Sequence, residues 1–217
     1  MPDTRIERME DLAERLRAQF EFILTIDREK QVLRQTRLAD GSRQENDAEH
    51  AWHMAVMTLL LAEYANEKID VARTVAMLLV HDLVEVYAGD TFAYDEKAKE
   101  TQRERELAAA DRLYRLLPED QAVYMRGLWD EFEAEVTPEA KFARTMDNLQ
   151  PMMLNAATDG ANWEAHGVRL SQILRRNANT SEGSEILWQY AKQQYLDPNV
   201  AKGRIIDDIT EKENQQD

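Results

Sequence analysis

The 217-residue chain contains no cysteine, only five prolines and only seven glycines. Without cysteine, neither disulfide bonds nor thiolate chemistry is available to it. Because proline and glycine are so few, long stretches run without interruption, and apolar residues recur in them at three- and four-residue steps. Alternating strand-like segments are scarce. We therefore expect an all-α fold.

Long apolar runs and basic charge are also scarce. No run approaches the roughly 18 residues that cross a bilayer, and the first residues lack the apolar stretch of a signal peptide. The formal charge is −15, from 27 basic and 42 acidic residues, which disfavours binding to nucleic acid or to an anionic membrane. A small anionic substrate is still compatible, because a metal and a few arginines can reverse the potential inside one pocket. We expect a cytoplasmic protein.

Hydrophobic residues make up 43% of the chain, enough for one compact core. We expect a single domain over residues 1–197, with its core at about 20–160, C-terminal helices at about 162–195, and a polar, frayed tail at 198–217. Helices are expected at about 3–24, 27–34, 46–66, 70–88, 95–117, 118–134, 138–158, 162–177 and 182–195, with a loop at 38–46.

Capping residues mark the start of two helices. Asn46 and Glu49 have the spacing of a capping box, and Pro138 follows Thr137 as a first helical residue follows an N-cap. In the helix that begins near Asn46, five large apolar residues suggest burial on most sides: Trp52, Val56, Leu59, Leu60 and Tyr64.

His81 and Asp82 follow directly on an apolar run, so both are expected at the edge of the core. Burying an imidazole and a carboxylate is costly unless they are paired or bound to a metal. His50 and Asp147 are candidate co-ligands. Two histidines and two carboxylates suit Mn, Fe, Co, Ni or Zn better than Ca. A single histidine in an apolar helix is usually a hydrogen-bonded core residue, but the set of four predicts a divalent metal site.

Two further carboxylates follow the pair. Glu85 lies four residues after His81 and would share its helical face, where it could accept a proton from an attacking water. Asp90, just after Gly89, could act at the leaving oxygen. The alternatives are an ion pair of Glu85 with an arginine, and a role of Asp90 in a turn alone.

As a set, these motifs resemble the HD-domain 5′-deoxynucleotidases. The order His, His-Asp, Asp identifies HD-domain phosphohydrolases, and further stretches over about residues 20–160 fit the same family. These stretches are Glu45-Asn-Asp-Ala-Glu-His50, Leu79-Val-His-Asp-Leu-Val-Glu85, Gly89-Asp90, Trp129-Asp-Glu-Phe-Glu and Thr137-Pro-Glu-Ala-Lys-Phe-Ala-Arg144.

The resemblance implies a compact helical bundle that hydrolyses deoxynucleoside 5′-monophosphates to deoxynucleoside and phosphate, and it implies a possible homodimer. It assigns one divalent ion (Mn, Co, Fe, Ni, Mg or Zn), because the histidines that other branches use for a second metal are absent here. The metal ligands would be His50, His81, Asp82 and Asp147, and the catalytic carboxylates Glu85 and Asp90.

One feature departs from the family pattern. Members of the bacterial type place an Arg-Trp pair upstream of the first histidine, to hold the phosphate and the sugar. The corresponding stretch here, Val32-Leu-Arg-Gln-Thr-Arg37, has no tryptophan. Arg34 is the first candidate for binding the phosphate, Arg37 the second and Arg43 the third. Each could instead be a surface arginine.

Other functions stay open at this point. The chain could hydrolyse another small phosphate ester or nucleotide, although few basic residues near the motifs disfavour a triphosphate. A di-iron oxygenase of the same fold is disfavoured by the small number of histidines. A non-enzymatic HD module with a structural metal is the third alternative, but such a module would not need Glu85 and Asp90.

Overall fold

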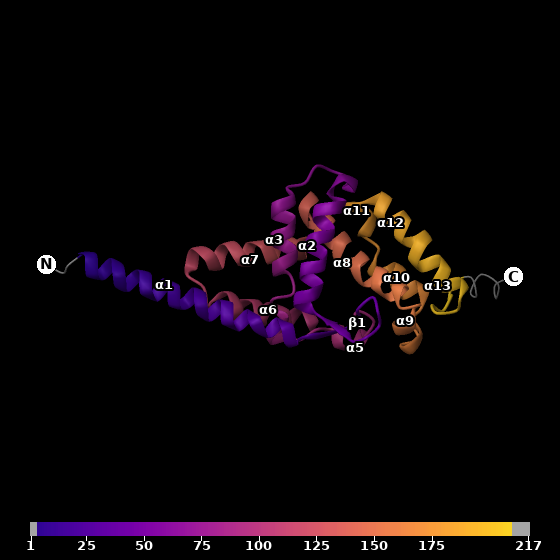
Figure 1. Cartoon of the computed structure of the whole chain (residues 1–217), viewed down its shortest axis with the longest axis horizontal. Helices are drawn as coiled ribbons and strands as arrows, with labels where there is room; N and C mark the ends of the chain where they lie inside the picture. Colours follow the sequence, from indigo (N-terminus) through magenta and orange to yellow (C-terminus); the bar gives the residue numbers. More distant parts are fainter. Residues whose placement is uncertain (1–3, 210–217) are drawn as a thin grey trace.

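The computed structural model describes residues 4–209, and most of them are helical (Figure 1). The elements are α1 (Thr4–Ile26), η1 (Asp27–Gln31), β1 (Leu33–Arg37), β2 (Gln44–Asn46), α2 (Asp47–Leu61), η2 (Ala62–Tyr64), α3 (Val71–Val80), α4 (Glu85–Ala88), α5 (Glu96–Lys99), α6 (Gln102–Tyr114), α7 (Glu119–Ala134), α8 (Pro138–Ala157), α9 (Ala161–Ala165), α10 (Leu170–Arg176), α11 (Thr180–Gly183), α12 (Glu185–Ala191), η3 (Lys192–Leu196) and α13 (Asp197–Ala201). The predicted all-α class is confirmed.

Helix α8 forms the centre of the bundle, and α2, α3, α7, α11 and α12 pack around it. It begins as predicted: Thr137 Oγ1 accepts a hydrogen bond from the Ala140 amide, and Pro138 occupies the first turn. Phe142 and Met146 on this helix are fully buried. Because α8 runs through the core, the middle of the helix lies among side chains from most of the fold.

The predicted capping box at the start of α2 is also present. Asn46 Oδ1 accepts a hydrogen bond from the Glu49 amide at 3.0 Å, and the Glu49 carboxylate accepts one from the Asn46 amide at 3.2 Å. This cap begins the helix at Asp47 and places His50 in its first turn.

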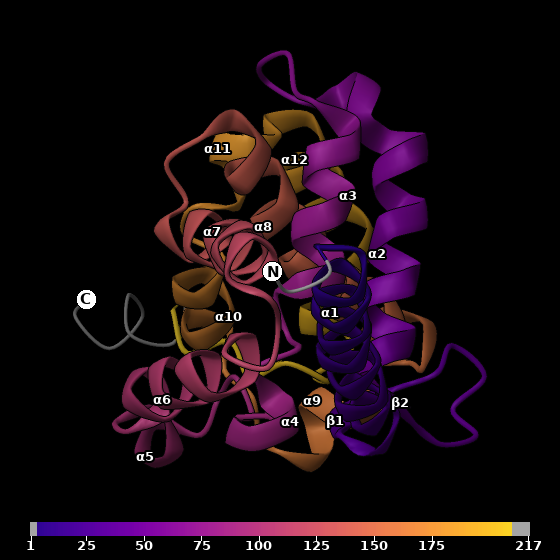
Figure 2. The same ribbon diagram turned by 90° about the vertical axis from the view of Figure 1, so that its left-hand side faces the viewer.

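The large apolar side chains of α1 and α2 lie mostly on the surface. The burial of α2 on most sides, expected above, is wrong, because only the face that carries Met54 and Met57 packs into the core. Helix α1 projects away from the bundle (Figures 1 and 2). The exposed apolar residues are Met9, Leu12, Leu16, Phe20, Ile23 and Leu24 on α1, Trp52, Val56, Leu59 and Leu60 on α2, and Tyr64 just beyond it. In the described part of the chain, no helix combines the length and apolarity that a membrane span requires.

A small β-hairpin replaces part of what was expected as a helix and a loop. Strands β1 and β2 pair antiparallel, with Leu33 opposite Asn46 and Arg37 opposite Gln44. The connecting turn contains Gly41 at φ 71°. The expected helix at 27–34 is confined to η1. The stretch is too short and too polar to show a strand period, so its pairing could not be predicted from the sequence.

His81 and Asp82 lie in a turn rather than inside a helix. Helix α3 ends at Val80, His81 is its C-cap residue, and Glu85 opens the separate helix α4. Gly89, at φ 74°, ends α4. The prediction that His81 and Glu85 share one helical face is therefore wrong, although both side chains line the same cavity.

Several expected helices are divided. Residues 95–117 form α5 and α6, residues 162–177 form α9 and α10, and residues 182–195 fall mainly in α12 and η3. The expected frayed tail is wrong for residues 198–209. Helix α13 continues the fold, Ile205 is only 1% exposed, and Ile206 forms a β-bridge with Arg169. These two isoleucines anchor a stretch that looks polar in sequence. Residues 210–217 lie outside the described part, and the single-domain boundary stays a prediction.

A buried polar cluster (Thr145, Asn148, Asn177 and Thr180) fastens the segment α10–α11 to α8. Asn148 Nδ2 donates to Thr180 Oγ1 at 2.9 Å, Thr180 Oγ1 donates to Asn177 Oδ1 at 3.2 Å, and Thr145 Oγ1 donates to the Thr180 carbonyl at 2.8 Å. Because buried polar groups cost free energy when unpaired, these bonds specify how the C-terminal helices dock.

We expect Gly183→Ala to destabilise the fold. A Cβ atom there would collide with the Lys141 carbonyl oxygen and with Thr145 Oγ1, and overpacking of this kind costs about 1–3 kcal/mol. Gly127→Ala is the matched control, because nothing lies within 4 Å of a Cβ at that helical position and alanine favours a helix over glycine. Urea unfolding monitored by circular dichroism would measure both. Equal stability of the two variants would contradict the close approach of α11 to α8.

Candidate active site

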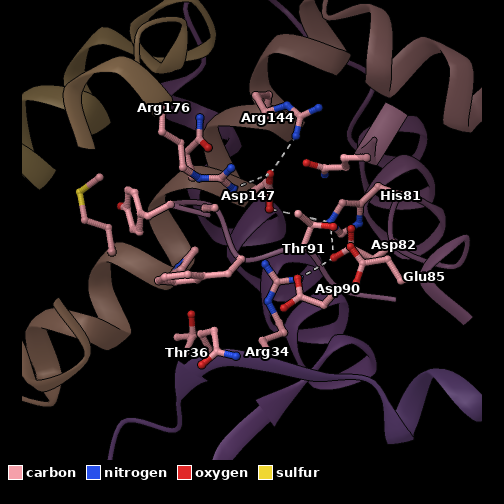
Figure 3. A pocket seen from close by; sticks show the side chains of 18 of the residues that line it. Arg34, Thr36, His81, Asp82, Glu85, Asp90, Thr91, Arg144, Asp147 and Arg176 are labelled. Carbon is pink, nitrogen blue, oxygen red and sulfur yellow. Dashed lines mark hydrogen bonds and ion pairs between the residues drawn. The ribbon is translucent and has the colours of Figure 1, made fainter. Parts of the chain in front are cut away.

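A cavity opens between β1, the turn after α3, and helices α6, α8, α9 and α10 (Figure 3). It brings together six of the residues singled out in the sequence: Arg34, His81, Asp82, Glu85, Asp90 and Asp147. His50 lies behind them, fully buried, with its Nε2 3.2 Å from Asp147 Oδ1. Arg37 is not part of the cavity, because its exposed side chain donates to the Gly41 carbonyl. The structure therefore gathers all of the predicted residues except Arg37 and Arg43.

Hydrogen bonding determines which nitrogen of His50 faces the site. Its Nδ1 lies 2.9 Å from Gln150 Oε1, and Gln150 Nε2 in turn donates to Glu45 Oε1. Because the amide oxygen can only accept, Nδ1 carries the proton and Nε2 presents a lone pair toward Asp147. Burial, with the charge of Arg34, lowers the pKa of His50 to about 4. His50 is therefore a neutral imidazole.

His81 is oriented in the same way. Its Nδ1 donates to the Leu78 carbonyl at 2.8 Å, so Nε2 points into the site. This Nε2 is buried and has no hydrogen-bond partner among the described residues, although Asp82 Oδ2 lies 3.0 Å away as an ion-pair contact. Burial disfavours the charged ring, but the Asp82 carboxylate outweighs it and raises the pKa of His81 to about 9. A metal ion would take the place of the Nε2 proton.

These donor atoms fit a divalent metal ion. One ligand atom from each of His50, His81 and Asp147 lies within 4.8 Å of the others. Ligand bonds of about 2.0–2.2 Å allow ligand atoms up to roughly 4.4 Å apart, and the distances from Asp147 Oδ1 to the two Nε2 atoms are 3.2 and 3.8 Å. Asp82 Oδ2, next to His81 Nε2, is placed to join them. The role of each single residue as a ligand stays a prediction.

Three more buried carboxylates surround this centre and were not singled out in the sequence: Glu29, Glu45 and Asp47. Burial, and next the charge of Asp82, raises the pKa of Glu29 to about 8 and that of Asp47 to about 7. The sequence could have indicated Glu45 and Asp47, because both belong to the motif that ends at His50. No sequence pattern indicated Glu29. This group of buried carboxylates around two histidines is a second indication that the site suits a cation.

Glu85 and Asp90 both border the cavity. Glu85 is 7% exposed, and its Oε2 has no hydrogen-bond partner among the described residues. Burial, and next the charges of Asp82 and Asp47, raises the pKa of Glu85 well above its ordinary value. Burial also raises the pKa of Asp90, which directly follows Gly89 at the end of α4. No ion pair of Glu85 with an arginine is present in the described part, so the alternative weighed from the sequence finds no support.

Arg34 extends from β1 into the cavity. Its Nη1 lies 2.7 Å from Asp82 Oδ2 and 3.3 Å from Asp47 Oδ1, and its side chain is 11% exposed. Arg43, the third candidate, is exposed and pairs with Glu49. Of the three arginines considered in the sequence, the structure brings Arg34 alone to the cavity.

Two more arginines in the cavity wall were missed. Arg144 Nη1 donates to Asp147 Oδ2 at 3.0 Å, and Arg176 from α10 lies 3.8 Å from the same oxygen. The expectation that few basic residues lie near the motifs is therefore wrong, because the fold brings these arginines to the cavity. The sequence could have indicated Arg144, because it lies three residues before Asp147 on a helix and such residues are neighbours on the helix surface. No sequence pattern indicated Arg176. The aromatic side chains of Tyr94 and Trp163 form another part of the cavity wall.

A family model and two named relatives give consistent results when this chain is compared with known proteins. A family model described as HD domain matches residues 26–188. The 5′-deoxynucleotidase HDDC2 of Xenopus laevis is 31% identical over 157 residues, which cover 72% of this chain and 75% of that protein. The human protein of the same name is 34% identical over 115 residues, which cover 53% of this chain and 54% of that protein.

A solved structure is closer still. The crystal structure of a predicted metal-dependent phosphohydrolase from Magnetospirillum magnetotacticum matches with a TM-score of 0.84 and 46% sequence identity, covering 89% of this chain and 96% of that one. At this identity the likeness extends beyond the fold. The resemblance drawn from the motifs is confirmed.

We expect Gln150→Leu to weaken binding of a divalent metal by about 10- to 100-fold, because loss of a partner that orients a ligating histidine has this effect. Leucine cannot accept the Nδ1 proton of His50, which would free the ring to change tautomer. Titration of Mn²⁺ into chelator-treated protein, followed by isothermal calorimetry, measures the affinity. Gln189→Leu, at an exposed position on α12, is the control. Unchanged affinity in Gln150→Leu would contradict the assigned tautomer.

Proposed function

Because the chain belongs to the HD domain family, we propose that it is a metal-dependent 5′-deoxynucleotidase that hydrolyses deoxynucleoside 5′-monophosphates to deoxynucleosides and phosphate. The names of its relatives and of its structural neighbour support this proposal. The observation that carries it is the convergence of two histidines and several carboxylates: His81, Asp82, Asp147, Glu85 and Asp90 line one cavity, and His50 lies directly behind Asp147.

His50, His81, Asp82 and Asp147 would hold one divalent ion. When bound, such an ion lowers the pKa of a water molecule and polarises a phosphoryl oxygen. The mixed nitrogen and oxygen donors suit Mn, Fe, Co, Ni or Zn, and Mg is included in the test below. The hydrogen bonds from the two Nδ1 atoms hold both rings with Nε2 toward the ion.

Glu85 and Asp90 are proposed to move the protons. Glu85 Oε2 is buried at the cavity surface and offers a lone pair that can accept a proton from the attacking water. As the water oxygen bonds to phosphorus and the bond to the 5′-oxygen breaks, the leaving oxygen takes a proton from the Asp90 carboxyl. The products are the deoxynucleoside and inorganic phosphate. Glu85 then releases its proton to solvent and Asp90 takes one up, which restores both carboxyls to their starting states.

The nucleoside is proposed to lie against the aromatic wall. Gln35 follows Arg34 where the family resemblance expects a tryptophan. In the structure, α9 packs against β1, and Trp163 of α9 lines the same cavity with Tyr94. An indole from another part of the chain thus offers the sugar and base an apolar surface. Arg34 is preferred to Arg37 for the phosphate, because only Arg34 reaches the cavity.

A panel of 5′-ribo- and 5′-deoxyribonucleoside monophosphates tests the function. Phosphate release would be measured on chelator-treated protein with Mn, Co, Fe, Ni, Mg or Zn added back separately. We expect turnover that requires metal and favours the deoxynucleotides. Absence of phosphate release with every metal would contradict the proposal and redirect the search to other phosphate esters.

Two variants separate an enzyme from a metal-containing binding module. Glu85→Gln should lower kcat by about 10²- to 10⁴-fold while its metal content stays that of the wild type, because Glu85 is proposed to accept a proton and not to bind the ion. Asp82→Ala should lose both metal and activity. Full activity in Glu85→Gln would remove Glu85 from the mechanism. Metal content is read by mass spectrometry of the purified proteins.

We also propose that the chain acts in the cytoplasm as a homodimer joined through the exposed apolar residues of α1 and α2. The largest apolar patches on monomeric proteins usually stay within a few hundred Å², whereas each partner in a stable interface buries about 800 Å². Phe20, Leu24, Trp52 and Leu59 are each 62–72% exposed on these two helices. A second copy of the same surface would cover them.

Light scattering on a size-exclusion column should give a mass of about 50 kDa, twice the 25.2 kDa of the chain. Leu16→Glu on α1 should shift the protein to the monomer, because it places a charge in the apolar stripe. Val136→Glu, at a residue 73% exposed outside these two helices, is the control and should stay dimeric. A wild-type mass near 25 kDa would contradict the dimer.

A further inference from the structure

Arg176 is the last residue of α10 and lines the cavity beside Asp147. Its Nη2 lies 3.8 Å from Asp147 Oδ2, beyond hydrogen-bond distance. Among the described residues, no hydrogen bond uses its guanidinium, although the side chain is only 28% exposed. A guanidinium carries five N–H donors, so Arg176 presents unused donors to the cavity.

The other two arginines of the cavity are already engaged. Arg34 forms ion pairs with Asp82 and Asp47. Arg144 pairs with Asp147 at 3.0 Å and with Glu135 at 2.8 Å, and it also contacts Glu133. Arg176 is therefore the cavity arginine with the greatest capacity left for an anion from solution.

The position of Arg176 is well defined. Asn177, the next residue, belongs to the buried polar cluster that fastens this segment to α8, and Ile173, one turn earlier, is fully buried. Figure 3 shows Arg176 and Arg34 entering the cavity from opposite sides, with Asp147 beside Arg176 and Asp90 beside Arg34. A positive side chain on each side of an acidic cavity suits a phosphate group that lies across it.

We propose that Arg176 binds the phosphoryl oxygens of the substrate from the side opposite Arg34, so that the C-terminal helices supply a substrate-binding residue. The inference rests on the proposed phosphohydrolase function. Helix α10 would then contribute to substrate binding as well as to the packing of the fold. Arginine suits this role, because its planar fork of donors matches two oxygens of a phosphate.

Arg176→Gln tests the proposal, with Arg175→Gln as the matched control. Arg175 is the exposed neighbour and does not line the cavity. With saturating Mn²⁺, we expect Arg176→Gln to lower kcat/KM for a deoxynucleoside monophosphate by about 10- to 100-fold. The inhibition constant of inorganic phosphate should rise with it. Arg176→Lys should recover part of both, and Arg175→Gln should match the wild type.

A merely structural role predicts another pattern. If Arg176 only oriented Asp147, the variant would bind Mn²⁺ more weakly, and its affinity for phosphate at saturating metal would be unchanged. That pattern would overturn the proposal, as would wild-type kinetics in Arg176→Gln. Should Arg176→Gln fail to fold, which circular dichroism detects, the Lys variant carries the same comparison.

A binding measurement separates this inference from the proposed function. Calorimetry of inorganic phosphate added to the Mn²⁺-loaded protein needs no turnover. Weaker phosphate binding in Arg176→Gln supports the inference even if the nucleotide panel is silent. Equal phosphate binding in the two proteins overturns it even if the wild type is an active nucleotidase.

Discussion

The carboxylate of Asp147 joins the parts of the chain that form the cavity. Its Oδ1 lies near Nε2 of His50 on α2 and of His81 at the end of α3, and its Oδ2 accepts a hydrogen bond from Arg144 and faces Arg176 on α10. Burial disfavours its charge, but the positive charges of Arg144 and Arg176 hold the pKa of Asp147 well below its usual range. The ionised group therefore stays inside the core, and the helices that supply its partners must dock around α8.

Features with a local cause could be predicted from the sequence. The caps at Asn46 and Thr137 lie within three residues of the groups that they bond, so spacing alone revealed both helix starts. The order of His50, His81, Asp82 and Asp147 indicated a common site, and the structure gathers these four side chains.

Features with a cause distant in sequence could not be predicted. Gln150 orients His50 across 100 positions of the chain, and Arg176 reaches Asp147 from a separate helix. The hairpin depends on a ladder between two short polar strands, and Trp52 looks like a core residue although α2 turns it outward. In each case tertiary contacts override the local pattern, and a single sequence does not display them.

The docking of α10–α11 on α8 also has a consequence for the order in which the site is assembled during synthesis. A chain emerges from the ribosome beginning at its N-terminus. The four candidate ligands, the last of them Asp147, are therefore available before α10 exists. The buried polar cluster needs both Asn148 and Thr180, so Arg176 takes its place only after the C-terminal helices have been made. All four candidate metal ligands are therefore synthesised before the arginine proposed to bind the phosphate.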